Sequence, residues 1–222
     1  MSSPESSGTE SSGTDGRVPG RRGLETRRRF LDQTRDLVET TNYRDLKVVD
    51  IAREVGSSPG TFYQYFADVE SAVLALADEL AEEGSRVLIE PLRSADWRGQ
   101  HALDACEEIA QVFLSFWSQH SGLMAVIDLA ALEGDARFRA CRTRLLNRFT
   151  VTATDVIRAQ KEAGFAPVDL DPEASAVVLV SMLSHVAAHQ RGISESGVTI
   201  DDLRRSMARV IYASVIGRTP LN

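Results

Sequence analysis

Apolar residues recur along most of the chain at the three- to four-residue spacing of helices, and no segment shows a notable strand-like alternation. In the first such segment, Phe30, Leu37 and Val38 fall on one helical face. The same spacing predicts helices over residues 23–41, 47–55, 59–66, 69–90, 100–120, 123–132, 135–163, 172–191 and 199–216. The pattern therefore predicts an all-α fold of about nine helices.

The residues between the second and third of these helices indicate a tight turn. Gly56 stands where the second helix stops, and Ser58 can cap the third. Pro59 suits the first position of that helix, where no amide donor is needed. Two short helices joined by a tight turn form a helix-turn-helix, whose second helix enters the major groove of DNA.

The side chains of the third helix fit this interpretation. Phe62 and Phe66 are four residues apart, so they share one face and should pack into a small core. Tyr63, Gln64 and Tyr65 then point more outward. Tyrosine hydroxyls can donate to phosphate oxygens, and a glutamine can pair with the edge of adenine. The helix therefore predicts a DNA-reading element.

Residues 22–70 resemble the DNA-binding domain of the tetracycline-repressor (TetR) family of transcriptional regulators. The matching residues are Asp50-Ile51-Ala52, Val55-Gly56, Ser58, Gly60-Thr61-Phe62-Tyr63, Tyr65-Phe66 and the acidic Glu70. The resemblance implies a nine-helix fold, a homodimer, and a C-terminal domain that binds a small inducing ligand. From about residue 90 onward, no motif of the family is recognisable in the sequence.

Two positions depart from the pattern of the family. Many members have a lysine that touches a phosphate early in the fourth helix, where this chain has Val69. Many begin the second helix with a capping threonine, where this chain has Lys47. We interpret the pair as a positive contact moved from the fourth helix to the second. The residues expected at the DNA interface are Arg22, Arg27, Arg28, Lys47, Val48, Ser58, Gly60, Thr61, Tyr63, Gln64 and Tyr65.

The overall charge by itself argues against DNA binding, because the 222 residues carry a net charge of −7. The charge is unevenly distributed, however. Residues 17–66 carry ten basic and seven acidic residues, whereas residues 67–222 carry fifteen basic and twenty-two acidic ones. Arginines are densest just before and within the first helix. We expect Arg22, Arg27 and Arg28 to contribute affinity for the DNA backbone rather than sequence choice.

Composition also divides the chain into domains. Residues 1–16 are rich in serine and glycine and carry three acidic residues and no basic one. Such a segment cannot bury enough surface to fold, so we expect residues 1–20 to form a disordered tail. The expected helix-turn-helix domain is 21–67, and residues 68–222 form the ligand-binding and dimerisation domain.

The second domain holds several aromatic and sulfur-containing residues that could line an apolar ligand pocket. These candidates are Phe113, Phe116, Trp117, Met124, Phe149, Met182 and His185. Each of them could equally be an ordinary core residue. His185 and His189 have a spacing that metals can use, but no third ligand stands at a matching distance, so no metal site or cofactor is predicted. The arginines between residues 137 and 148 are typical of a solvated helix face.

Residues 172–191 are apolar almost all round, so this helix needs cover on two faces. A two-fold interface built from this helix and the helix 199–216 would supply the second cover. The sequence therefore predicts a homodimer through its last two helices. The two subunits would read a near-palindromic DNA operator, which a small apolar ligand would make the protein release.

Several classes are disfavoured. No stretch approaches 18 apolar residues, and the N-terminus lacks the order of a secretory signal, so we expect a cytoplasmic protein with no membrane partner. Cys106 and Cys141 cannot make a disulfide framework and are expected in the core. No catalytic motif is present, so we expect no enzyme. An all-α enzyme and an interaction module that keeps the fold without binding DNA stay as alternatives.

Overall fold

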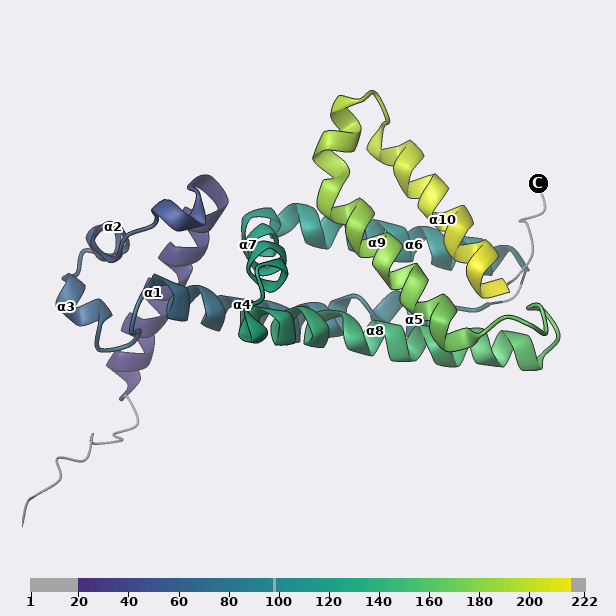
Figure 1. Ribbon diagram of the computed structural model, residues 1–222, viewed down its shortest axis with the longest axis horizontal. Coiled ribbons are helices and arrows are strands. Elements are labelled where there is room, and N and C mark those ends of the chain that lie inside the picture. Colours follow the sequence, from purple (N-terminus) through teal and green to yellow (C-terminus); the bar gives the residue numbers. More distant parts are fainter. Residues whose placement is uncertain (1–19, 98, 217–222) are drawn as a thin grey trace, which may run out of the picture.

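The computed structural model describes residues 20–97 and 99–216, and this part of the chain contains helices and no strand (Figure 1). In chain order the elements are α1 (Arg21–Thr40), the 3-10 helix η1 (Tyr43–Asp45), α2 (Val48–Glu54), α3 (Pro59–Phe62), α4 (Val69–Val87), α5 (Glu90–Ser94), α6 (Gly99–Gln119), α7 (Ser121–Leu132), α8 (Ala136–Glu162), α9 (Pro172–Glu195) and α10 (Ile200–Ile216). Each helix expected from the apolar spacing is present, so the all-α prediction is confirmed. Of the tail expected over residues 1–20, residues 1–19 lie outside the described residues.

The structure differs from the sequence expectations at two helix ends and in one additional helix. The α-helix α3 ends at Phe62 rather than at residue 66, and a turn follows through Tyr65. The helix α9 continues past Gly192 to Glu195. The glycine with a positive φ, which is typical of a helix end, is Gly197, at 95°. The short helix α5 was not expected. Pro91 lies in its first turn, where a missing amide donor costs nothing.

The helices α1, α2 and α3 form one end of the molecule, which we call the reading head (residues 21–66; Figure 1). Its core contains Phe30, Ile51, Phe62 and Phe66, each of which is at most 5% exposed. The apolar faces that the sequence spacing predicted therefore meet in one small core.

The helix α4 leaves the reading head and packs along α8 in the rest of the chain, which we call the body (Figure 1). Asp68 caps α4 by accepting a hydrogen bond from the amide of Ser71 at 2.7 Å. Gly84 lies where α4 crosses the body, and a Cβ there would overlap the side chains of Leu145 in α8 and Phe116 in α6. A glycine at this position lets the three helices approach closely.

The arginines of α8 are more than a solvated face. Arg137 forms ion pairs with Glu70 at the start of α4 and, at 2.7 Å, with Asp135. About two helical turns further along α8, Arg144 forms an ion pair with Asp78 of α4. The hydrogen bond from Arg137 lowers the pKa of Asp135 to about 2. These arginines therefore connect α8 to α4, although they are also about half exposed.

The helices α9 and α10 belong to the body, where they pack against α6 and α8 (Figure 1). Their inner faces are buried, as Leu183 and Ile211 show at 0% exposure. Their outer faces expose Val177, Val178 and Val210, with 69% of Val178 accessible. Within the described residues, no helix combines the length and the apolar character needed to cross a membrane.

Candidate DNA interface and ligand pocket

Aromatic packing fixes the position of α3 in the reading head. The ring of Phe62 meets Phe30 of α1 edge-on, with centroids 5.3 Å apart, and also contacts Phe66 at 5.4 Å. Ser58 caps the helix, because its Oγ accepts a hydrogen bond from the amide of Thr61 at 3.2 Å. The expected cap and the expected buried pair Phe62 and Phe66 are both confirmed.

The opposite side of α3 and its turn presents polar groups to solvent. Tyr63 is 57% exposed, with its ring set edge-on against Phe62, and Gln64 is exposed. Tyr65 is half-buried, since its ring lies 6.1 Å from Phe30. Tyr63 and Gln64 therefore contribute little to the protein core, whereas Tyr65 also helps to hold α3 on α1.

Gly60 and Thr61 lie in the first turn of α3. Within the described part of the chain, a Cβ at Gly60 would meet only Ser58 Oγ, at an ordinary 3.7 Å, so no described neighbour requires a glycine there. The hydroxyls of Ser58 and Thr61 lie 3.0 Å apart and form a hydrogen bond. The open surface around Gly60 is suited to close approach by another molecule.

The start of α2 carries the departure from the family pattern. Lys47 occupies the N-cap position, is exposed, and makes no side-chain capping bond. An ammonium group cannot accept hydrogen bonds from the free amides of the first turn. Val48, the next residue, is half-buried against the core of the head. The positive charge of Lys47 is thus exposed at the surface, and the side chain does not cap α2.

Two of the three candidate arginines of α1 form no ion pair with a described residue. Arg22 is exposed and forms no ion pair with any described residue. The guanidinium of Arg27 lies 5.1 Å from the centre of the Phe66 ring, in cation–π contact. Both side chains keep donors for a phosphate.

Arg28 is held differently. Its guanidinium pairs with Asp32 at 2.9 Å and with Glu79 of α4 at 2.9 Å. Arg35 also reaches Glu79, at 3.4 Å. Arg28 therefore joins the reading head to α4 through ion pairs at the surface, where its side chain is 48% exposed.

A second junction between the head and the body involves a residue that the sequence did not single out. The carboxylate of Glu39, near the end of α1, accepts hydrogen bonds from the amides of Gly122 at 2.8 Å and Leu123 at 3.3 Å. It also accepts one from the hydroxyl of Ser121 at 3.1 Å. A Cβ at Gly122 would overlap the backbone of Val38 and Glu39. We call this contact between α1 and the first turn of α7 the seam.

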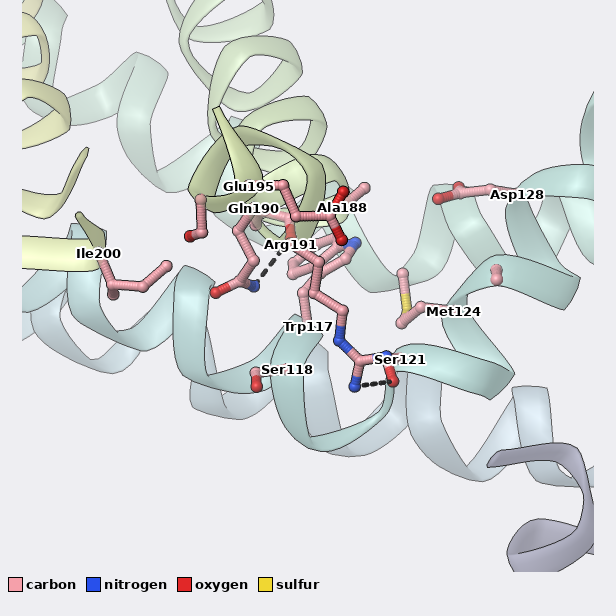
Figure 2. A pocket seen from close by; sticks show the side chains of 13 residues that line it. Trp117, Ser118, Ser121, Met124, Asp128, Ala188, Gln190, Arg191, Glu195 and Ile200 are labelled. Atoms are coloured by element: carbon pink, nitrogen blue, oxygen red, sulfur yellow. Dashed lines mark hydrogen bonds between the residues drawn. The ribbon is translucent and has the colours of Figure 1, made fainter. Parts of the chain in front are cut away.

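The body contains a cavity of about 440 Å³ between the end of α6, the helix α7, the C-terminal half of α9 and the start of α10. Trp117 and Met124 line it, as the sequence suggested for a ligand pocket. Sequence reasoning missed Gln190, Arg191 and Ser194, which line it from α9. Figure 2 shows Arg191 reaching from α9 to Ser121 across this cavity, with a hydrogen bond of 3.3 Å.

The other candidate ligand residues lie elsewhere. Phe113 and Phe149 are fully buried, with their rings 4.9 Å apart, and Phe116 is packed beside Gly84. They fill the core and do not line this cavity. Met182 is half-buried on α9 and lies outside the cavity as well.

His185 borders a separate hollow between α7, α8 and α9. Its ring stacks on that of His189, with centroids 4.2 Å apart, and His189 Nδ1 lies 2.8 Å from the His185 carbonyl. Among the described residues, no three His, Cys, Asp or Glu side chains gather as metal ligands would.

Both cysteines are buried and free, as expected for core residues. Burial raises the pKa of Cys106 to about 12. Burial, with the neighbouring Asp78, raises that of Cys141 to about 11. Neither thiol has the lowered pKa of a reactive cysteine.

A capped, exposed helix on a small aromatic core, joined to a helical body with a cavity, defines a helix-turn-helix DNA-binding regulator. The chain belongs to the TetR family. Residues 30–76 match the family described as bacterial regulatory proteins of the tetR family, and residues 88–222 match the tetracyclin repressor-like C-terminal domain. The second match covers the part of the chain in which the sequence alone showed no motif.

Individual relatives agree with this assignment. The chain is 25% identical over 197 residues to the HTH-type transcriptional regulator EthR of Mycolicibacterium smegmatis, covering 86% of this chain and 87% of that protein. Its fold is similar to that of the fatty acid degradation regulator FadR from Bacillus halodurans, with a TM-score of 0.65, 15% identity, and coverage of 88% and 97%. A TetR-family regulator from Rhodococcus sp. has a TM-score of 0.62, 17% identity, and coverage of 86% and 99%.

The chain is thus a transcriptional regulator with an N-terminal DNA-binding domain.

Proposed function

We propose that this chain is a homodimeric repressor that binds a near-palindromic operator and releases it when a small molecule occupies the body. The observation that carries this proposal is the exposure of Tyr63 and Gln64 on a helix that Ser58 and the Phe30–Phe62 contact hold in place. A rigid helix that presents polar side chains outward is what reading a groove requires.

The side chains divide by the DNA groups they would meet. Gln64 reads a base edge, while Tyr63, Tyr65 and Thr61 donate to phosphates. Lys47, Arg22 and Arg27 supply charge along the backbone.

The remaining candidates are Ser58, Gly60, Val48 and Arg28. Ser58, Gly60 and Val48 lie where the two short helices approach the DNA surface. Arg28 joins the backbone contacts by exchanging one of its carboxylate partners for a phosphate.

The dimer in this proposal forms through α9 and α10. The support is the row of exposed valines on their outer faces, of which Val178 and Val210 are examples. Apolar side chains on two adjacent helices are suited to self-complementary contact about a two-fold axis. Sedimentation of the full chain at micromolar concentration should give a dimer. Val178→Glu should shift it toward monomer, whereas Val168→Glu should leave it unchanged, because Val168 is an 88% exposed residue in the loop before α9. A monomeric wild type would contradict this.

The test of DNA reading is selection of bound duplexes from a random pool by the purified full chain. The expected result is a site of two related half-sites, separated by about one helical turn or a multiple. Gln64→Ala should then relax base preference at one position of each half-site, at a cost of about 1–3 kcal/mol. Recovery of no preferred sequence would overturn the proposal.

A further inference from the structure

The cavity of the body contains polar groups that the protein leaves unsatisfied. Trp117 Nε1 and Ser194 Oγ are buried and have no hydrogen-bond partner among the described residues. Both residues line the cavity, and Trp117 is only 4% exposed. A buried N–H that stays unpaired is costly, so a ligand that brings an acceptor would be favoured at this position.

Arg191, which is exposed to solvent, adds a positive charge without an ion-pair partner among the described residues to the same cavity. Its guanidinium donates to Ser121 Oγ, and no described carboxylate lies within ion-pair distance of it (Figure 2). The lining carboxylate of Asp128 is already paired with Arg142 at 2.8 Å. The other, Glu195, lies one turn beyond Arg191 on α9 and is exposed to solvent. An arginine in this state is suited to a carboxylate, which it can bind through two parallel hydrogen bonds.

Apart from these groups and the polar Ser118, Ser121 and Gln190, the cavity wall is aliphatic. Met124 and Ala125 of α7, Ala187 and Ala188 of α9, and Ile200 of α10 provide this surface. The volume of about 440 Å³ lies within the range of small-molecule sites. Aliphatic walls beside one cation and one free N–H favour a molecule with a short hydrocarbon chain and an anionic end.

The Ser121 hydroxyl connects this cavity to the reading head. It accepts from Arg191 at 3.3 Å and donates to Glu39 of α1 at 3.1 Å. The positive guanidinium thus lies two hydrogen bonds away from the negative carboxylate that holds the seam. Any ligand that neutralises Arg191 also removes favourable charge from Glu39.

We propose that the cavity binds a small aliphatic carboxylate through Arg191 and Trp117 Nε1, and that this binding withdraws Arg191 from Ser121 and loosens the seam. The proposal rests on the proposed function of a ligand-responsive regulator, and it names the ligand class and the path to the head. Because coupling is reciprocal, a carboxylate that loosens the seam binds less well when the head is held on DNA.

Binding is tested on the full chain without DNA, by titration calorimetry with octanoate and with 1-octanol as an uncharged match. Octanoate should bind the wild type at least roughly tenfold more tightly than 1-octanol, and Arg191→Gln should remove most of that difference. Arg158→Gln on α8, an exposed arginine outside this cavity, is the matched control. Equal affinity of octanoate for wild type and Arg191→Gln, or no binding of any straight-chain carboxylate of 4 to 12 carbons, overturns the proposal.

Coupling is tested by hydrogen exchange at the amides of Gly122 and Leu123, which Glu39 holds. Octanoate should accelerate their exchange severalfold in the wild type. In Ser121→Ala, octanoate should still bind but leave the exchange of these amides unchanged. Binding without faster exchange in the wild type overturns the path through Ser121. Since neither measurement contains DNA, a failure of operator release alone counts against the proposed function and not against this site.

Discussion

The carboxylate of Glu39 accepts a hydrogen bond from the backbone amide of Gly122 at 2.8 Å, and this contact joins the reading head to the body. Glu39 stands near the C-terminal end of α1, where the helix dipole disfavours a negative charge. The same carboxylate lies at the N-terminal end of α7, where free amides and the dipole favour it. The position of Glu39 is therefore stabilised by the body and not by its own helix.

The seam should fail when Gly122 acquires a side chain. A Cβ at Gly122 overlaps the backbone of Val38 and Glu39, so Gly122→Ala forces α1 and α7 apart. We expect a loss of about 1–3 kcal/mol in the free energy of unfolding, or roughly 3–10 °C in Tm, measured by thermal denaturation.

Gly192→Ala is the matched control for this change. A Cβ at Gly192 meets no described residue within 4 Å, and Gly192 lies inside the helix α9. Alanine there should raise stability by roughly 0.5–1 kcal/mol. Equal thermal behaviour of the two variants would show that the seam contributes nothing to stability.

The seam also marks a limit of prediction from sequence. The helices flanking it follow from the apolar spacing, which reports which face of each helix is buried. Glu39 is an ordinary acidic residue in that pattern, and its partners are backbone amides more than 80 residues away. No local signal encodes such a pairing. The break in the apolar pattern at Gly122 was visible, but its cause was the backbone of another helix.

Gly60 separates a folding role from a binding role. Because a Cβ there meets Ser58 Oγ at 3.7 Å and no other atom of the described residues within 4 Å, Gly60→Ala should fold normally, with Tm unchanged or slightly raised. In the proposed complex, however, the added methyl group lies between α3 and DNA. We expect weaker operator binding, measured by fluorescence anisotropy with labelled duplex, together with unchanged thermal stability. Undiminished affinity would show that DNA does not approach this turn closely.

Lys47 offers a variant whose two effects have opposite signs. Lys47→Thr supplies the N-cap oxygen that α2 lacks, so stability should rise by about 1 kcal/mol. It also removes a positive charge from the proposed DNA surface, so the slope of log K against log salt should become shallower by about 0.9. Thermal denaturation and binding at several salt concentrations measure the two effects separately. A steeper or unchanged slope would contradict the phosphate contact.

The pocket shows what composition can and cannot predict. Aromatic and sulfur-containing side chains were reasonable candidates for its walls, and Trp117 and Met124 are among its lining residues. Phe113, Phe116 and Phe149 have the same chemistry but fill the closed core. Sequence cannot distinguish a wall from a core, because both are apolar faces of helices. The polar wall from α9 escaped notice because Arg191 looks like any surface arginine.

The thiols provide a test of burial. The pKa values of Cys106 and Cys141, about 12 and about 11, mean that both stay protonated at pH 8 in the folded chain. A thiol reagent such as DTNB should therefore titrate neither residue at pH 8 without denaturant, and two thiols in guanidinium chloride. A fast-reacting thiol in the native protein would contradict the buried positions.

The same raised values predict how stability changes in alkali. The unfolded thiols have pKa values near 9.0, below those of the folded chain. Their contribution is fully present below about pH 9 and is lost as the pH rises toward 11 and beyond, since the unfolded state then loses its protons first. Replacing both cysteines with alanine should reduce this alkaline loss in urea titrations. An unaltered pH dependence would place its origin in other groups.

The arginines of α1 give the most direct test of how charge is shared between DNA and the fold. Arg22 has no ion-pair partner among the described residues, so Arg22→Ala should leave Tm unchanged while the salt slope falls by about 0.9. Arg28 is paired with Asp32 and Glu79, so Arg28→Ala should also lower stability, by up to about 1 kcal/mol. Replacing Arg22, Arg27 and Arg28 together should weaken binding to specific and random duplexes alike. Unchanged affinity and salt dependence in the triple variant would contradict the backbone role of these arginines.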